Sequence, residues 1–574
     1  MNAKENGDPP LEEYLPENQN GSILITSRNK GEAQKLVDSR DVIEVSMMDE
    51  ATAVLLFEKK MGRRLETQDV IVELVSELGF LPLAIVQAAS LMRKRGDRFS
   101  VRRYLDAFRK NDEMKVGLLK YDDGARELRR DRERPIFITL QMSLSYLQER
   151  RPSAAKLLSV MSFFGGQGIT ESLFHEQSGL DLAFDDDVQE LQDYSLISRM
   201  DVHTAFSMHR LVQVATRDWL KKHDQLEKPK KQFINILSSR FPKGSYENWA
   251  VCRPLFPHIL SAVKHNEDQP FPEEIMLQWA SLLNNASVYA RTIGAMKDSE
   301  KMASQSMNAR NMILGPEHPD ALSSMNSLAN TYLDQGRYEE AEKFRVQVLE
   351  AQKRILGPEH PHTLSNMGYL AITYQNQGRY EEAEKLYVQV LEVQKRILGP
   401  EHPHTLMSMN NLASTYWNQG RYKEAKKLYV QVVEARKRIL GPEHPSTLSS
   451  VSNLAITYSH QGRYDETKKL YVQVLEGQKR ILGPEHPSTL KSKNNLAYTY
   501  GSQGRYKEAE KLCVKVLEAQ KRILGPDHPD TLMSMNNMAI TRREPKDDGR
   551  KQKSWRARFR RHAKAFLDSF EPSS

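Results

Sequence analysis

The sequence predicts a mainly α protein in which an α–α superhelix follows a smaller helical region that carries a short α/β piece. Two recurring marks support this prediction. The tripeptide Leu-Gly-Pro returns every 42 residues, with its glycine at Gly315, Gly357, Gly399, Gly441, Gly483 and Gly525. The tripeptide Gly-Arg-Tyr keeps the same period, with its glycine at Gly336, Gly378, Gly420, Gly462 and Gly504. A fixed period of this length is typical of repeat arrays, which usually bind other molecules.

Each repeat predicts a pair of antiparallel helices. Between Leu406 and Tyr416 the apolar residues recur at three- and four-residue steps, which places them on one helical face. Gly420 breaks that helix, and a second apolar face runs from Tyr422 to Leu440. A single pair cannot bury its apolar face alone, so the pairs are expected to stack. The predicted array covers residues 279–541, with irregular units at both ends, and a helical linker at 226–278 leads into it.

The order Leu-Ala-x-x-Tyr, then Gly-x-Tyr, then Ala resembles the tetratricopeptide repeat. The 42-residue period and the linker Leu-Gly-Pro-Glu-His-Pro resemble the kinesin-light-chain type of this repeat. The resemblance implies that the first helix of each pair lines a concave groove. It also implies that the two residues before the core leucine face that groove.

Asparagines occupy most of these groove positions. An Asn amide both donates and accepts hydrogen bonds, so a ladder of amides is suited to holding an extended peptide backbone. Lys491 would add a cation for an acidic ligand. The alternative is that Asn is only a tolerated polar residue on an exposed helix. The predicted peptide-binding asparagines are Asn326, Asn410, Asn411, Asn453, Asn494, Asn495, Asn536 and Asn537.

One histidine recurs in every linker of the array. The six histidines lie a whole helix pair apart, so they cannot converge on one metal ion, and a structural role at the turn is expected. They are His318, His360, His402, His444, His486 and His528.

Three motifs of the N-terminal region resemble the NB-ARC module of signal-transducing ATPases. They are the strand-like segment 21–28, the segment Gly79-Phe80-Leu81-Pro82-Leu83-Ala84 and the segment 206–211. The resemblance divides the region into a distal fragment of the nucleotide-binding α/β subdomain (1–48), a helical subdomain (49–131) and a winged-helix-like subdomain (132–225). It implies nucleotide contacts for Arg28, Pro82 and His209. Arg210 stands where the family has an aspartate, which departs from the pattern.

The phosphate-binding loop of this family is absent from the sequence. No Gly-x-x-x-x-Gly-Lys-Ser/Thr segment occurs in the chain, and such a loop supplies the amides and the lysine that hold the phosphates. We therefore expect no enzyme activity and no bound cofactor. ADP or ATP would bind only if upstream sequence supplied the loop. Overall the chain resembles fungal NLR-like (STAND) proteins that carry a light-chain-type array.

Composition agrees with an interaction protein. The chain has two cysteines, 39% hydrophobic residues and a net charge of +8, of which the tail 542–574 contributes 11 Lys/Arg against 5 Asp/Glu. The sequence indicates a cytoplasmic protein with no specific nucleic-acid partner. The basic tail contains an amphipathic stretch. It is interpreted as a cap on the array, with membrane contact as the alternative.

These observations predict a scaffold or ligand sensor that binds a protein or an extended peptide in the groove, with self-association possible. One alternative is a nucleotide-gated signalling switch completed by upstream sequence. The other is a cargo adaptor resembling kinesin light chains. Against this alternative, no heptad segment precedes the repeats.

Overall fold

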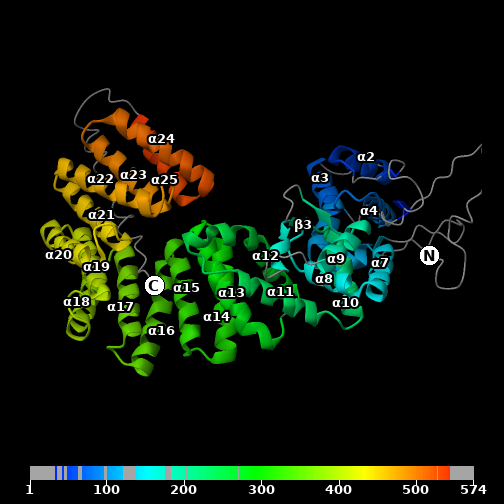
Figure 1. The fold of residues 1–574 in the computed structure, drawn as a ribbon, viewed down its shortest axis with the longest axis horizontal. Helices are drawn as coiled ribbons and strands as arrows, with labels where there is room; N and C mark the ends of the chain where they lie inside the picture. The colour runs from blue at the N-terminus through cyan, green and yellow to red at the C-terminus, as the bar shows by residue number, and fades with distance from the viewer. Residues whose placement is uncertain are drawn as a thin grey trace, which may run out of the picture. The chain divides into compact units, whose positions relative to one another are not determined.

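The computed structural model describes residues 48–62, 68–95, 100–110, 112–119, 136–174, 182–200, 205–268, 271–526 and 528–542, together with residues 27, 33–34 and 42–43. The predicted strand near 22–26, Arg28 and most of the tail lie outside these residues. The described chain divides into two compact units. Residues up to 242 with 247–282 form the first, and 243–246 with residues from 283 onward form the second. Each unit is considered by itself (Figure 1).

An apolar core in the first unit joins helices that lie far apart in its sequence. The helices are α2 (Glu50–Met61), α3 (Gln68–Glu77), α4 (Pro82–Arg95), α5 (Val101–Lys110), α6 (Asp112–Leu119) and α10 (Arg210–Lys222). Phe57, Leu74 and Tyr104 are buried together with Leu211 and Val214 of α10. The segments 49–119 and 210–222 therefore share a single core.

A small antiparallel sheet lies within the same unit. Its strands β1 (Ile169–Thr170), β2 (Ser198–Arg199) and β3 (Ala205–Ser207) are arranged in the order β1-β3-β2, with Ile169 opposite Phe206. The flanking helices are α7 (Ile136–Arg150), α8 (Pro152–Met161), the 3₁₀ turn η3 (Glu171–Leu173) and α9 (Leu182–Asp193). The chain continues through α11 (Glu227–Arg240), η4 (Tyr246–Asn248), α12 (Trp249–Asp268) and α13 (Glu273–Thr292).

The second unit is the predicted array of helix pairs, which confirms the mainly α superhelix. Odd-numbered helices lie on the inside of the curve and even-numbered helices on the outside (Figure 1). Odd-numbered neighbours such as α17, α19 and α21 also contact one another. The helices are α14 (Met296–Leu314), α15 (Pro319–Asp334), α16 (Tyr338–Leu356), α17 (Pro361–Asn376), α18 (Tyr380–Ile397), α19 (Pro403–Asn418), α20 (Tyr422–Leu440), α21 (Pro445–His460), α22 (Tyr464–Ile481), α23 (Pro487–Ser502), α24 (Tyr506–Ile523) and α25 (Pro529–Arg542).

The recurring histidines have a structural role, as predicted. Each one is the N-cap of an odd-numbered helix. In one linker Nδ1 of His402 accepts a hydrogen bond from the backbone N–H of His404 at 3.2 Å, which satisfies a donor that the helix itself leaves unpaired. Proline follows at the first helical position, where its missing N–H costs nothing. The linker glycine has a φ of 90° at Gly441, a conformation that glycine adopts readily.

In the earlier pairs the arginine of Gly-Arg-Tyr binds a glutamate of the preceding pair. The Arg421 guanidinium lies 4.0 Å from the ring centroid of Tyr416, donates to Glu384 of the preceding pair at 2.9 Å and bonds Glu424 at 2.6 Å. The same arrangement recurs at Arg337 and Arg379. Burial of the helix faces drives stacking, and this contact fixes the register of neighbouring pairs.

In the later pairs that the structure describes, the Gly-Arg-Tyr arginine no longer has a glutamate partner in the preceding pair. Lys426 and Lys468 occupy the positions of Glu342 and Glu384 in the later pairs. Among the described residues, Arg463 consequently keeps the contact with the ring of Tyr458, at 4.3 Å, and the bond to Glu466, at 2.6 Å, with no partner in the preceding pair.

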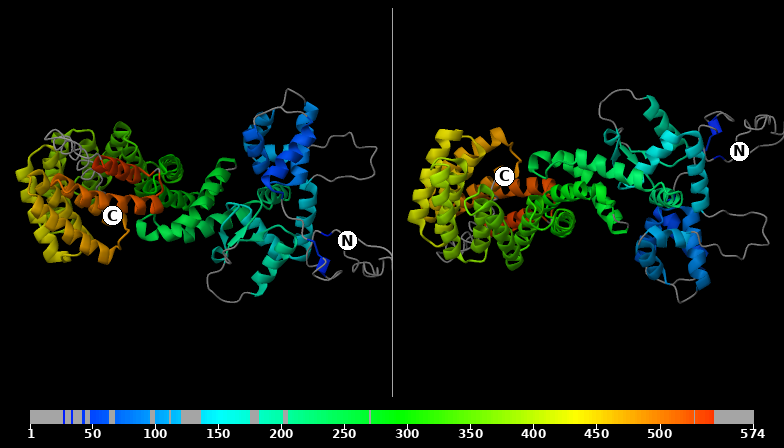
Figure 2. Two further views of the ribbon diagram at one scale, coloured as in Figure 1. Left: turned by 90° about the horizontal axis from the view of Figure 1, so that it is seen from above. Right: turned by 90° about the horizontal axis from the view of Figure 1, so that it is seen from below.

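The array curves until its last helix reaches its first pair. Both views in Figure 2 place the red helix α25 beside the green start of the array. Nε2 of His528 lies 3.2 Å from the carbonyl oxygen of Thr292. Pro529 packs near Gly294. The second unit therefore closes a full turn within the described residues.

Replacing Lys426 with Glu should restore the missing bridge to Arg463. We expect Lys426→Glu to raise the free energy of unfolding of the array by about 0.5–1 kcal/mol, because an exposed carboxylate–guanidinium pair replaces two neighbouring cations. Urea unfolding measures the change. Lys427→Glu alters the same charge on an exposed neighbouring position and is the control. Equal stabilisation by both variants would contradict the proposed bridge.

Candidate functional site

The inner wall of the array contains the predicted asparagines, but three of them are buried. Asn410 (5% exposed), Asn453 (0%) and Asn494 (8%) lie between neighbouring odd-numbered helices. Nδ2 of Asn453 donates to Oδ1 of Asn410 at 3.2 Å, which joins α21 to α19. Nδ2 of Asn494 donates to Oγ of Ser534 at 3.2 Å, which joins α23 to α25.

The prediction that all eight amides are open to the groove is therefore wrong for these three. Close packing of the odd-numbered helices on the inside of the curve turns these positions toward the next helix. Buried polar groups need hydrogen-bond partners. The Nδ2 atoms of Asn453 and Asn494 have them, whereas their Oδ1 atoms are buried with no partner among the described residues. Their role is to hold the wall together.

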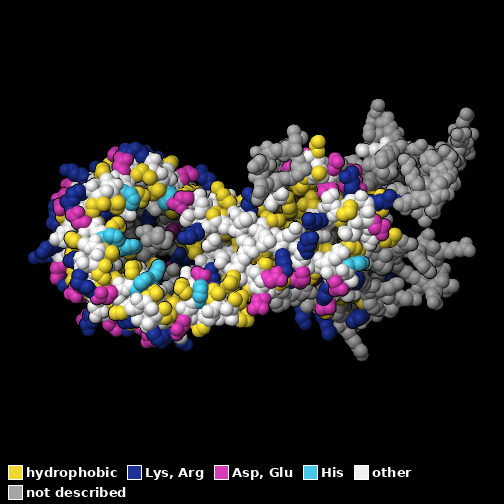
Figure 3. Space-filling model, turned by 60° about the horizontal axis from the view of Figure 1, so that its bottom comes forward, with side chains coloured by type: hydrophobic (Ala, Val, Ile, Leu, Met, Phe, Trp, Pro, Cys, Tyr) yellow, Lys and Arg dark blue, Asp and Glu magenta, His cyan; other side chains and the backbone are white. Residues whose placement is uncertain are grey.

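The other five asparagines remain candidates for ligand contact. Asn326, Asn411, Asn495 and Asn537 are half-buried and Asn536 is exposed. They lie on four different odd-numbered helices, so the amides form a discontinuous row along the inner side. Figure 3 shows this part of the molecule hollowed, with histidine side chains around the hollow.

Lys491 is half-buried near the start of α23, the helix that also carries Asn495. Burial lowers the pKa of its ammonium group, while the nearby carboxylate of Asp530 on the next odd-numbered helix opposes that shift. An acidic side chain of the protein already lies near this lysine. Its contact with an acidic ligand stays a prediction.

In the first unit the structure brings two of the NB-ARC-like motifs into contact. Nε2 of His209 lies 3.2 Å from the carbonyl oxygen of Gly79, and Nδ1 accepts from the backbone N–H of Leu211 at 3.1 Å. Since Nδ1 accepts, Nε2 carries the hydrogen and donates to Gly79. Both ring nitrogens of His209 are thus occupied by the protein. Pro82 is the exposed first residue of α4, and Arg28 lies outside the described residues.

Glycine is required at position 79 by two independent constraints. Its φ is +66°, and a Cβ atom there would lie 1.8 Å from Nε2 of His209. The following residue, Phe80, also has a positive φ of 56°. The loop between α3 and α4 is held in this shape against the start of α10.

The arginine that departs from the family pattern has its own partner. Arg210 forms an ion pair with Glu77, at the end of α3, and Arg109 bonds the same carboxylate at 2.8 Å. His209 and Arg210 together fasten α10 to the end of α3 and the loop after it.

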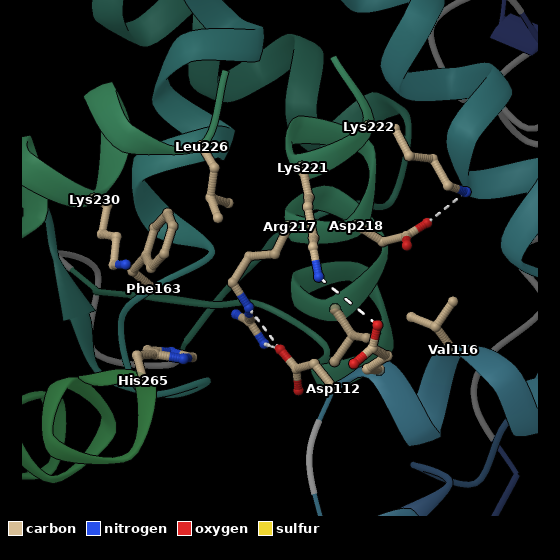
Figure 4. A pocket seen from close by; sticks show the side chains of 12 residues that line it. Asp112, Val116, Phe163, Arg217, Asp218, Lys221, Lys222, Leu226, Lys230 and His265 are labelled. Carbon is tan, nitrogen blue, oxygen red and sulfur yellow. Dashed lines mark hydrogen bonds and ion pairs between the residues drawn. The ribbon is translucent and has the colours of Figure 1, made fainter. Parts of the chain in front are cut away.

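A cavity of about 430 Å³ lies between α6, α10 and α12 of the first unit (Figure 4). Its charged lining is largely paired internally. Nη2 of Arg217 bonds Asp112 at 2.7 Å, and Lys222 bonds Asp218 at 2.8 Å. Burial alone would raise the pKa of Asp112, but Arg217 and Lys115 hold it well below its usual range. No motif marks this cavity in the sequence, because its lining residues are scattered between positions 112 and 265.

Comparison with known proteins identifies the array. The Tetratricopeptide repeat family matches residues 279–354, 324–387, 363–438, 408–466, 446–512 and 492–549. The second unit is a tetratricopeptide-repeat solenoid. Upstream of these repeats, residues 145–225 match a Domain of unknown function (DUF7779).

A curated relative supports the NLR-like expectation. A nucleotide-binding leucine-rich repeat (NLR)-like protein of Hyaloscypha variabilis is 37% identical over 321 residues, which make up 55% of this chain and 32% of the relative. The chain thus spans about a third of that relative's length. With the tetratricopeptide repeats, this likeness confirms the expected resemblance to NLR-like proteins.

Two solved structures are also similar. The nearly identical TPR-like repeats of a Podosopora anserina putative kinesin light chain are 37% identical, covering 36% of this chain and 97% of that chain with a TM-score of 0.31. A STAND protein with a tetratricopeptide repeat sensor from Pyrococcus horikoshii is 12% identical, covering 92% and 75% with a TM-score of 0.33.

Among the residues described, none of the helices combines the length and the apolar composition that crossing a bilayer requires.

Gly79→Ala should destabilise the first unit by at least about 2 kcal/mol, because left-handed strain is added to a clash with His209. Urea unfolding measures the loss. Gly62→Ala is the matched control: Gly62 also has a positive φ, of 73°, but nothing lies within 4 Å of its added Cβ. Gly62→Ala should cost less. A Gly79→Ala variant no less stable than Gly62→Ala would argue against the contact.

Acidification should also weaken the first unit. Burial lowers the pKa of His209, His258 and His265. In the unfolded chain these histidines bind protons near their ordinary pKa of about 6.5, whereas in the folded unit they stay neutral at that pH. The unfolded state therefore binds more protons, and the free energy of unfolding decreases as the pH falls below about 6.5. We expect a loss of at least about 1 kcal/mol between about pH 7 and pH 5. Pulsed hydrogen exchange of α10 and α12 after equilibration in urea measures it. Equal urea midpoints at pH 7 and pH 5 would contradict the lowered pKa of these histidines.

Proposed function

We propose that the tetratricopeptide-repeat solenoid binds an extended segment of polypeptide along its inner wall, and that the chain works as a non-catalytic ligand sensor. As a tetratricopeptide-repeat protein the chain is a protein-interaction scaffold. The proposal adds that the ligand is an extended peptide and that it lies along the inner helices. The observation that carries it is the row of half-buried and exposed amides on the inner helices, formed by Asn326, Asn411, Asn495, Asn536 and Asn537.

The row is suited to a peptide backbone for a chemical reason. An Asn amide carries one acceptor and two donors, and an extended backbone presents both kinds of group at regular intervals. Within the row, Oδ1 of Asn326 and Nδ2 of Asn495 are themselves buried. A ligand held through its backbone needs no particular sequence at these positions, so specificity would come from side chains elsewhere on the wall.

The buried amides support the same proposal indirectly. The bond between Asn453 and Asn410, and the bond between Asn494 and Ser534, fix neighbouring inner helices relative to each other. A wall that is already rigid loses less conformational entropy when a ligand binds. The buried asparagines therefore preorganise the positions from which the others would make contact.

A passive first unit is also proposed. Both nitrogens of His209 are bonded within the protein, and Arg210 is paired with Glu77. A nucleotide phosphate would have to break the bond between His209 and Gly79 to reach that ring. We infer that these motif residues have a structural role in this chain, joining α10 to the loop after α3.

Removing two amides of the row should weaken peptide binding. We expect Asn411→Ala combined with Asn495→Ala to lower the affinity for peptides selected from a displayed random library by about tenfold, since each lost hydrogen bond contributes roughly 0.5–1.5 kcal/mol. Fluorescence anisotropy of the labelled peptides measures the change.

The matched control is Asn308→Ala, because Asn308 is exposed on the even-numbered helix α14. Affinity should be unchanged by that variant. Failure of the chain to select any peptide would overturn the proposed function. Tight binding of fluorescent ADP by this chain would instead favour the nucleotide-gated switch.

A further inference from the structure

Among the described residues of the array, three arginines are buried, and Arg345 is the most deeply buried of them. Arg345 on α16 is 1% exposed. The equivalent positions one, two and three periods later hold Tyr387, Tyr429 and Tyr471, all of them buried core residues. Arginine has thus replaced an aromatic ring at a position that lies beneath the inner wall.

The contacts of this guanidinium are incomplete. Nη2 donates to Oδ1 of Asn330 at 2.7 Å, and the ring centroid of Tyr369 lies 5.1 Å away. Nε and Nη1 are buried and have no hydrogen-bond partner among the described residues. No carboxylate of the described chain lies within ion-pair distance of Arg345. Asp334, the carboxylate that influences it, is bonded to Arg291 at 2.9 Å.

Two other buried arginines of the array have more complete hydrogen bonding to the protein. Nη1 of Arg310 donates to the carbonyl oxygen of Asp320 at 3.0 Å and to Oγ of Ser324 at 2.9 Å. Arg436 makes the corresponding bonds to Ser446 and Ser450. For both, main-chain and hydroxyl oxygens accept from the guanidinium. Arg345 has only the Asn330 amide.

Several residues around Arg345 also depart from the repeat. Asn330, its hydrogen-bond partner, stands where later pairs have Ile372, Ser414 and Ile456. Tyr369, the ring beside it, stands where later pairs have Asn411, Asn453 and Asn495. Gly368 leaves the preceding position without a side chain, where Asn410 and Asn494 occur later. Four replaced positions on three helices thus meet at the junction of α15, α16 and α17.

We propose that Arg345 binds a carboxylate of the peptide held on the inner wall, which anchors that peptide at the junction of α15, α16 and α17. The inference rests on the proposed function. Asn330 and Tyr369 are both half-buried. In the proposed complex the Tyr369 ring, which lies 5.1 Å from the guanidinium, rotates aside so that the peptide reaches Arg345. Nε–H and Nη1–H then donate to the carboxylate oxygens.

The local charge points to a carboxylate rather than a phosphate. Arg345 and Arg291 supply two positive charges and Asp334 one negative charge. One monoanion therefore neutralises the site, whereas a phosphate close to a dianion would leave it negative. The guanidinium remains charged at neutral pH, so a neutral ligand group would leave the buried cation uncompensated.

The experiment selects peptides from a displayed random library with the wild-type chain and with Arg345→Tyr, which installs the residue of the later pairs. Selected peptides are resynthesised with each Asp or Glu changed to its amide, and separately with an amidated C-terminus. These two sets distinguish a side-chain carboxylate from a terminal one. For the wild type, removal of one carboxylate should weaken binding at least about tenfold. For Arg345→Tyr the same removal should have less than about a twofold effect.

Arg310→Gln is the matched control, since glutamine holds this position in four later pairs, as Gln352, Gln394, Gln478 and Gln520, and the variant also removes a buried arginine. It should keep the wild-type preference for the carboxylate. Peptides selected by the wild type without any carboxylate dependence would overturn the inference and leave peptide binding intact. Equal dependence in Arg345→Tyr would overturn it as well. If neither chain selects peptides, the proposed function itself fails.

Discussion

The architecture of the second unit depends on the inability of one helix pair to bury its own apolar surface. Each pair has two faces to cover, and each neighbour covers one of them. Tyr387, Tyr429 and Tyr471 fill this interface, fully buried between successive pairs. In the earlier pairs the Gly-Arg-Tyr arginine adds an ion pair with the preceding pair. Repetition of one angle between pairs produces a regular curve, and His528 meets Thr292 where the turn is complete.

The helix pairs of the array could be predicted from the sequence because Gly and Pro residues end and begin the helices and recur with the 42-residue period. The placement of individual inner residues was harder. Asn410 and Asn411 are adjacent on one helix, yet one is buried and the other is half-buried. That difference depends on how closely α19 and α21 approach, which follows from the curvature of the whole array. Helical periodicity identifies a face but does not give the distance to its neighbour.

In the first unit, the limits of prediction have another cause. The motifs at 79–84 and 206–211 could be recognised from their residues, but their contact joins positions 130 residues apart. The shared core of α3, α4 and α10 is equally remote in sequence. Resemblance to the NB-ARC module suggested nucleotide ligands for Pro82 and His209. The structure places the His209 ring against the backbone of Gly79, where its polar atoms are satisfied without a ligand.

A nearly uniform repeat makes its own exceptions informative. All pairs stack in the same way, so a residue that every pair shares can be explained by the stacking. A residue that only one pair has needs another explanation. The change from Glu384 to Lys426 removes an inter-pair bridge and leaves the stacking intact, so that bridge is dispensable at that point. Arg345 is a different kind of exception, because it introduces a buried charge into a core position and costs stability unless something compensates it. Asn330 compensates it only partly. Stacking of the pairs does not require Arg345, Asn330 or Tyr369 at this junction. Binding of a carboxylate ligand would compensate the buried charge and account for all three residues.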